Sequence, residues 1–171
     1  MIRTRKIVII GLLVGLGLIM HFVETMLPLT AVVPGAKLGL ANIVSLIGIV
    51  LFGFSGGLQI VLLRIIIGSL LAGTFMTINF YLSLSGGLLS FFMMYFVYEF
   101  FQDKFSLIGV SVIGAVTHNI GQIVIAYLII ENAAVFYYLP FLTLLAVPTG
   151  ISVGLVSFFT VSYLPTSLTG R

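Results

Sequence analysis

Arg64 is the residue with the clearest chemical consequence, because it is the only charged residue between Leu38 and Tyr98. The stretch around it is too apolar to lie anywhere but in a membrane. A charged side chain at the centre of a bilayer costs about 2.5–3.5 kcal/mol even on the mildest insertion scales. We therefore expect Arg64 to be paired or to face the interior of a helix bundle. It is either a counter-charge for an anionic ligand or a structural cation, paired with backbone carbonyls or extended toward one membrane surface.

A second polar group, His118, Asn119 and Gln122, lies in a later apolar stretch. His118 and Gln122 are four residues apart and share one face of a helix, and Asn119 is three residues from Gln122. Three such side chains are too costly to face lipid, so they should face the bundle interior. They either contact a ligand or form hydrogen bonds between helices. No cluster of His, Asp or Glu surrounds His118, so we expect no metal site.

The composition identifies the class of protein. The chain has 171 residues, of which 61% are hydrophobic and only 6% are charged, whereas soluble domains have about 25% charged residues. No water-soluble fold could bury this much apolar surface, so the chain is an integral membrane protein.

Several kinds of chemistry are not supported by the sequence. The absence of cysteine excludes disulfides and thiolate catalysis, and no phosphate-binding P-loop pattern is present. The acidic residues are scattered, so no aspartate cluster could hold the Mg²⁺ that prenyl diphosphate synthesis requires. We expect neither enzymatic activity nor a bound cofactor. The four acidic residues are Glu24, Glu99, Asp103 and Glu131.

The apolar runs predict an all-α integral membrane protein, a single domain over residues 1–171 with six transmembrane helices. The turns fall at polar or glycine-rich breaks, and the long run from Leu38 to Phe75 is divided at Gly53–Gly57. We expect a loop or a short helix around Pro140, before the last span. The predicted spans are about 7–27, 38–54, 58–74, 79–101, 106–130 and 142–163.

The basic residues predict the orientation. With six spans, one side of the membrane has five basic residues outside the spans, and the other side has only Lys37. Both termini should therefore be cytoplasmic. The five residues on the cytoplasmic side are Arg3, Arg5, Lys6, Lys104 and Arg171.

Small residues spaced by four occur in two predicted spans, at Gly11 and Gly15 in the first and at Gly68 and Ala72 in the third. Such pairs allow helix backbones to approach closely. They serve either packing within this bundle or docking to another membrane subunit.

The first outer loop is a third candidate region, with His21 and Glu24 before it and Lys37 and Asn42 after it. Glu24 and Lys37 could form an exposed ion pair of little energetic value. Alternatively, the loop covers an outward-facing pocket, with a defined turn at its Pro34-Gly35.

Four segments of the chain together resemble a known family. They are PGAKLGLANIV at 34–44, Leu63-Arg64 with Gly68 and Gly73, SLSGGLLS at 83–90, and GAVTHNIGQ at 114–122. This combination resembles the Gx transporter family, which also carries the label heptaprenyl diphosphate synthase component I. The family is related to the substrate-binding S components of energy-coupling factor (ECF) transporters.

The resemblance implies a six-helix bundle in the bacterial cell membrane that binds a micronutrient from the outer side. Its partners would be a membrane T component and cytoplasmic ATPase subunits, and Gly11 and Gly15 would dock on the T component. A flavin, a quinone precursor and an isoprenoid phosphate are all candidate ligands. The alternative is a non-catalytic membrane partner of a heptaprenyl diphosphate synthase. The ligand-binding residues that the resemblance implies are Lys37, Asn42, Asn79, His118, Asn119 and Gln122. Arg64 lies outside the helices that usually bind the ligand in this family, so it is a further candidate on the grounds of its chemistry.

Overall fold

The computed structural model describes residues 3–26 and 39–164, and this part of the chain is entirely helical. It has four helices of 23–25 residues and one of 30 residues, and short connections join the last four of these helices along the chain. The elements are α1 (Arg3–Met26), α2 (Asn42–Leu71), α3 (Ile78–Phe100), α4 (Leu107–Ile130), the short 3-10 helix η2 (Ala133–Tyr138) and α5 (Leu139–Tyr163).

Five of the described helices are long and apolar enough to cross a membrane. Large apolar side chains are exposed along them, such as Ile7, Leu70 and Leu144, as expected where lipid is the solvent. The protein is therefore an all-helical, multi-pass membrane protein. The prediction of six separate spans differs from this result, because predicted spans 38–54 and 58–74 both fall in α2.

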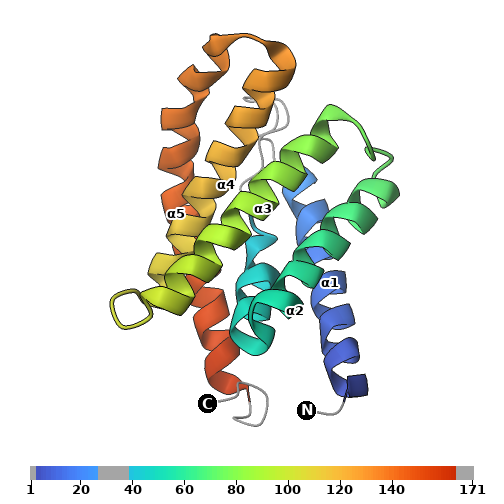
Figure 1. The fold of residues 1–171 in the computed structure, drawn as a ribbon, viewed down its shortest axis with the longest axis vertical. Helices are drawn as coiled ribbons and strands as arrows, with labels where there is room; N and C mark the ends of the chain where they lie inside the picture. Colours follow the sequence, from blue (N-terminus) through green and yellow to red (C-terminus); the bar gives the residue numbers. More distant parts are fainter. Residues whose placement is uncertain (1–2, 27–38, 165–171) are drawn as a thin grey trace.

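Helix α2 is a hairpin of two arms. Gly53 has non-helical dihedrals (φ 62°, ψ −155°), and it lies at the edge of the predicted break at residues 53–57. A methyl group placed on Gly48 would lie 3.4 Å from the Cα atom of Gly57. Residues nine apart in a straight helix are about 13 Å apart along the axis, so this closeness requires the chain to turn back. Figure 1 shows the turn at the lower end of α2.

The first arm, residues 42–52, is too short to be a full crossing. Eleven helical residues extend about 16 Å, about half of a hydrocarbon core of about 30 Å. All of residues 44–49 are buried, so this arm is enclosed by the other helices. The left-handed Gly39 (φ 80°) begins the turn that leads into it. The predicted span 38–54 is thus a half-length arm in the core of the bundle.

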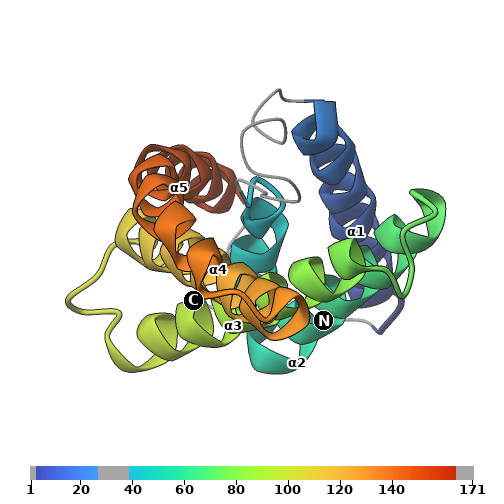
Figure 2. The same cartoon turned by 90° about the horizontal axis from the view of Figure 1, so that it is seen from above.

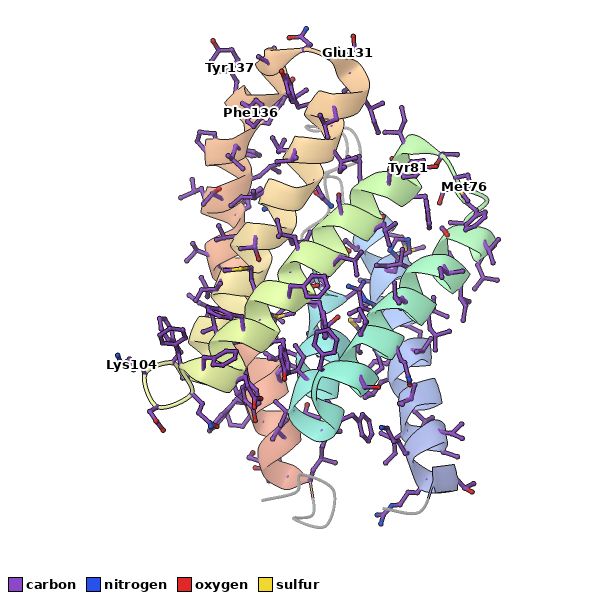
Figure 3. All side chains as sticks on the ribbon, in the orientation of Figure 1. Met76, Tyr81, Lys104, Glu131, Phe136 and Tyr137 are labelled. Atoms are coloured by element: carbon purple, nitrogen blue, oxygen red, sulfur yellow. The ribbon has the colours of Figure 1, made fainter. Side chains whose placement is uncertain are left out.

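The helices pack as sequential neighbours, with α3 against α4, α4 against α5, and α2 between α1 and α3 (Figures 1 and 2). The beginning of α1 and the end of α5 lie at the same end of the molecule. Lys104 lies at that end as well, whereas Glu131 lies at the opposite end (Figure 3). This distribution agrees with the predicted placement of the termini; the cytoplasmic orientation itself stays a prediction.

Glycines bring α3, α4 and α5 into close contact. A methyl group on Gly121 of α4 would lie 2.8 Å from the carbonyl oxygen of Ser85 in α3. A methyl group on Gly154 of α5 would lie 2.5 Å from the Cα atom of Ile108 in α4. In a membrane, helix association depends on such close packing, because lipid is as apolar as the helix surfaces.

The last span is preceded by a short helix, as expected from Pro140. Helix η2 is a turn of 3-10 helix that begins after Asn132, whose side chain accepts a hydrogen bond from the N–H of Ala134 at 2.9 Å. Pro140 lies in the first turn of α5, where its missing N–H has no consequence.

We predict that Gly121→Ala destabilises the protein and that Gly11→Ala does not. The added methyl group at position 121 meets backbone atoms that cannot move aside, at a typical cost of about 1–3 kcal/mol. The same group at position 11 has no atom within 4 Å. Thermal unfolding in detergent, followed by circular dichroism, gives the melting temperature of each variant. Equal melting temperatures for the two variants would contradict the close α3–α4 packing.

Candidate functional site

A polar cavity lies among the last part of α1, the turn before α2, the second arm of α2, α3 and α4. Its volume of about 20 Å³ is enough for about one water molecule. It is in the half of the bundle that faces away from the two termini, because α1 contributes the last part of its length. The polar side chains that line it are His21, Glu24, Arg64, Ser69, Ser83 and His118, and Thr74 lies at its rim.

Glu24 is buried in this site, with only 4% of its surface exposed. Its Oε1 atom accepts hydrogen bonds from the backbone N–H groups of Gly39 and Leu40, the latter at 3.4 Å. It therefore ties the last part of α1 to the turn that begins α2. The interpretation of Glu24 as half of an exposed ion pair with Lys37 is wrong for Glu24, because its carboxylate lies in the interior. Lys37 lies outside the described residues.

Arg64 is almost fully buried and lines the same cavity. Its Nη2 atom donates a hydrogen bond to Asn42 Oδ1 at 3.3 Å, which links the two arms of α2. The guanidinium also interacts electrostatically with the carboxylate of Glu24. Gly17 of α1 makes room for this side chain, since a methyl group there would lie 3.3 Å from Arg64 Cδ. Arg64 therefore lies in the bundle interior, where Glu24 attracts it, and does not extend to a membrane surface.

Two donor atoms beside this pair have no acceptor among the described residues. They are Arg64 Nε and Asn42 Nδ2, and both are shielded from solvent. The Asn42 amide lies against the turn into α2, where a methyl group on Gly39 would approach its Nδ2 atom to 2.9 Å. A buried donor without an acceptor costs about 1–3 kcal/mol, so this arrangement favours an acceptor group that the described residues do not supply.

His118 contributes an imidazole ring from α4. Its Nε2 atom lies 3.0 Å from Gln122 Nε2, one helical turn away. An amide nitrogen only donates, so in this arrangement the histidine Nε2 accepts and the ring carries its proton on Nδ1. Gly86 of α3 accommodates the ring, since a methyl group there would lie 3.0 Å from His118 Cε1. Gln122 therefore orients His118, as their predicted common face requires.

Asn119 and Asn79, both expected to bind the ligand, do not line the cavity. Asn119 Nδ2 donates a hydrogen bond at 2.9 Å to the carbonyl oxygen of Leu142 in α5, so it links two helices. Asn79 is exposed in the first turn of α3 and is not in the cavity lining. The structure therefore brings together Asn42, Arg64, His118 and Gln122, but not Asn79.

Two pairs of small residues have different surroundings. Methyl groups on Gly11 and Gly15 would meet no atom within 4 Å, so this face of α1 is open. A methyl group on Gly68 would lie 3.3 Å from Leu18 Cδ2, so Gly68 serves packing of α2 on α1. Packing inside the bundle, one of the two interpretations of these pairs, holds for Gly68 and not for Gly11 and Gly15.

The arrangement can bind a polar or charged group, and it offers one cation, one carboxylate and an oriented imidazole. Within residues 3–26 and 39–164, no three His, Cys, Asp or Glu side chains are grouped so that they could hold a metal ion. Glu24 was the residue missed as part of the interior. A signal was available, since Glu24 is the only acidic residue before Glu99 and thus the only acid in the first half of the chain that could neutralise Arg64.

Comparison with known proteins gives one match. A family model described as "Heptaprenyl diphosphate synthase component I" matches residues 13–160, which is most of the chain. No curated protein and no solved structure matches the chain.

We predict that Gly39→Ala is more destabilising than Gly73→Ala. Both glycines have positive φ angles (80° and 65°), so alanine carries a conformational cost of about 1–2 kcal/mol at each position. Only at position 39 does the methyl group also displace the Asn42 amide; at position 73 it meets nothing within 4 Å. Thermal unfolding of the two variants gives the difference. Equal losses of stability would show that the contact between Gly39 and Asn42 is unimportant.

Proposed function

From the premise that this chain belongs to the heptaprenyl diphosphate synthase component I family, we propose that it is a non-catalytic membrane subunit that binds a small molecule. We propose further that it is the substrate-binding subunit of an ECF-type transporter in the bacterial cell membrane. The ligand would be a micronutrient or cofactor-like molecule, with a flavin, a quinone precursor and an isoprenoid phosphate as candidates.

The observation that carries the proposal is the burial of Arg64 and Glu24 together beside a cavity at membrane depth. A buried ion pair contributes little to stability, because the loss of hydration offsets most of the attraction. Ionisable residues within transmembrane segments are instead characteristic of ligand and ion sites. The two unsatisfied donors, Arg64 Nε and Asn42 Nδ2, support ligand binding at the same place.

The cavity is too small to hold a small molecule as it stands. Ligand sites for small molecules have volumes of about 300–1,000 Å³, whereas this cavity has about 20 Å³. Binding then requires the helices around the cavity to separate. The hydrogen bonds from Gly39 and Leu40 to Glu24 hold α1 and the start of α2 together, so they would have to rearrange.

The open face of α1 supports the proposed partners. Gly11 and Gly15 lie in a transmembrane helix, and their face is free of contacts within the described chain. Small residues at this spacing allow another helix to approach closely. A membrane T component would dock there, and the energy would come from cytoplasmic ATPase subunits in other chains.

The second candidate function is favoured by the family description. In it, the chain is the membrane partner, component I, of a heptaprenyl diphosphate synthase whose catalytic chain is separate. The two functions predict different phenotypes. If the chain is a transporter subunit, deletion of its gene would lower the transport of a small molecule. If it is the partner of a synthase, deletion would lower the synthesis of polyprenyl chains.

We predict that the protein, purified in mild detergent and then denatured, releases a small molecule in near-equimolar amount. Arg64→Ala and His118→Ala should each lose at least about nine-tenths of it, a difference of about 1.4 kcal/mol or more in binding. Ser152→Ala, on the exposed side of α5, serves as the control. Mass spectrometry with an absorbance scan identifies and quantifies the compound. Full retention of the compound by both well-folded variants would show that it binds elsewhere.

We also predict that Gly11→Leu and Gly15→Leu remain folded but lose their membrane partner. The added side chains enter empty space in the isolated chain and would occupy the surface needed for docking. Co-purification from native membranes, followed by protein identification, measures the loss. Co-purification of a prenyl synthase chain with the unaltered protein, and of no ATPase, would replace the transport proposal by the second function.

A further inference from the structure

The carboxylate of Glu24 occupies a small anion-binding turn of the protein's own backbone. Two successive N–H groups, those of Gly39 and Leu40, point at the same oxygen atom of Glu24. Gly39 has the left-handed conformation (φ 80°). Successive N–H groups in a turn of this kind form a concave site with partial positive charge, which binds anions.

Further donors lie next to this turn. Arg64 faces the same cavity and is attracted to Glu24. Its Nε atom and the Nδ2 atom of Asn42 are buried and have no acceptor among the described residues. The Asn42 amide also lies directly against Gly39. Glu24 therefore occupies a site with more donors than its carboxylate satisfies.

We propose that Glu24 is an internal substitute for the anionic group of the ligand. In the bound state, a compact anionic group, a carboxylate or a phosphate, takes the place of the Glu24 carboxylate. It is held by the N–H groups of Gly39 and Leu40, by Asn42 Nδ2 and by Arg64. This deepens the proposed function, on which it rests for the existence of a ligand.

Space and charge prevent both anions from occupying the site together. The cavity holds about one water molecule, so a ligand group enters only when the carboxylate leaves. Two like charges a few ångströms apart in a medium of low dielectric constant also repel strongly. Glu24 can leave because it lies in the last turn of α1, two residues before the highly exposed Met26.

The exchange has a consequence for specificity. A neutral molecule cannot displace Glu24, because it would leave Arg64 without a negative charge at membrane depth. An anionic molecule replaces one partner of Arg64 by another. Glu24 is therefore a specificity-determining residue that excludes uncharged molecules and weakens the binding of anionic ones.

The test uses a single cysteine as a reporter, since the chain has none of its own. Ser83→Cys places a thiol in the cavity lining, and Thr77→Cys places one on the exposed turn before α3 as a control. The full chain in lipid nanodiscs is treated with sulfonatoethyl methanethiosulfonate, which is anionic, or with its trimethylammonium analogue, which is cationic. At each position, the rate of modification by the anionic reagent is divided by the rate of modification by the cationic reagent. The ratio at position 83, divided by the ratio at position 77, measures the preference of the cavity for an anion.

Glu24→Gln should raise this normalised ratio about tenfold, because it removes the internal anion and leaves Arg64 and the N–H groups in place. Glu99→Gln, an exposed change of the same chemistry at the end of α3, should not alter it. Addition of Arg64→Gln to Glu24→Gln should return the ratio to its original value. The proposal would be overturned by any of three results. The ratio stays unchanged in Glu24→Gln, the rise persists after Arg64→Gln is added, or the thiol at position 83 is unreactive in every variant.

A protection experiment provides a second measurement if the Arg64 variant does not fold. Inorganic phosphate or acetate should slow modification of the thiol at position 83 in the Glu24→Gln protein at concentrations that have no effect in the protein with Glu24. Protection by phosphate alone identifies a phosphate-bearing ligand, and protection by acetate alone identifies a carboxylate; protection by neither contradicts the proposal. The thiol reagents could show that the cavity prefers anions while denaturation releases no small molecule and no partner co-purifies. That result would support the anion site and reject the transport function.

Discussion

The burial of Arg64 is the constraint on which the site half of the bundle depends. A guanidinium at membrane depth needs acceptors and a negative charge, and these come from separate parts of the chain. Asn42 supplies the acceptor from the other arm of α2, and Glu24 supplies the charge from α1. The hydrogen bond between Asn42 and Arg64 requires α2 to turn back at Gly53, because residues 42 and 64 would be about 33 Å apart in a straight helix.

The rest of the bundle is assembled by a different interaction. Helices α3, α4 and α5 approach one another through glycines, and the Asn119 amide adds a hydrogen bond to the Leu142 carbonyl. These contacts leave little room for side chains to move. The cavity instead lies where α1 and the second arm of α2 meet α3 and α4, next to the turn at Gly39 and Leu40 that hydrogen bonds to the Glu24 carboxylate hold in place.

Family membership and geometry bear on function in different ways. The family description refers to a prenyl diphosphate synthase, whereas the described side chains form a small polar cavity among apolar helices. A membrane subunit that binds a small molecule is compatible with both. In the arrangement of Arg64, Asn42 and Glu24, side chains of the same protein supply both the hydrogen-bond acceptor and the negative charge that attract the guanidinium.

The sequence by itself determined that this is an all-helical membrane protein, because its apolar runs have no other stable environment. It also determined that Arg64, His118 and Gln122 face the interior, since lipid exposure of such groups is too costly. The location of the turn at Gly53 followed from local glycine content. Only the tertiary structure decided that residues 42–52 form a short enclosed arm, that Glu24 is buried as the counter-charge of Arg64, that Asn119 links helices and that Asn79 stays exposed. These features depend on which helices become neighbours, and the spacing of residues along one helix carries no information about the distance to another.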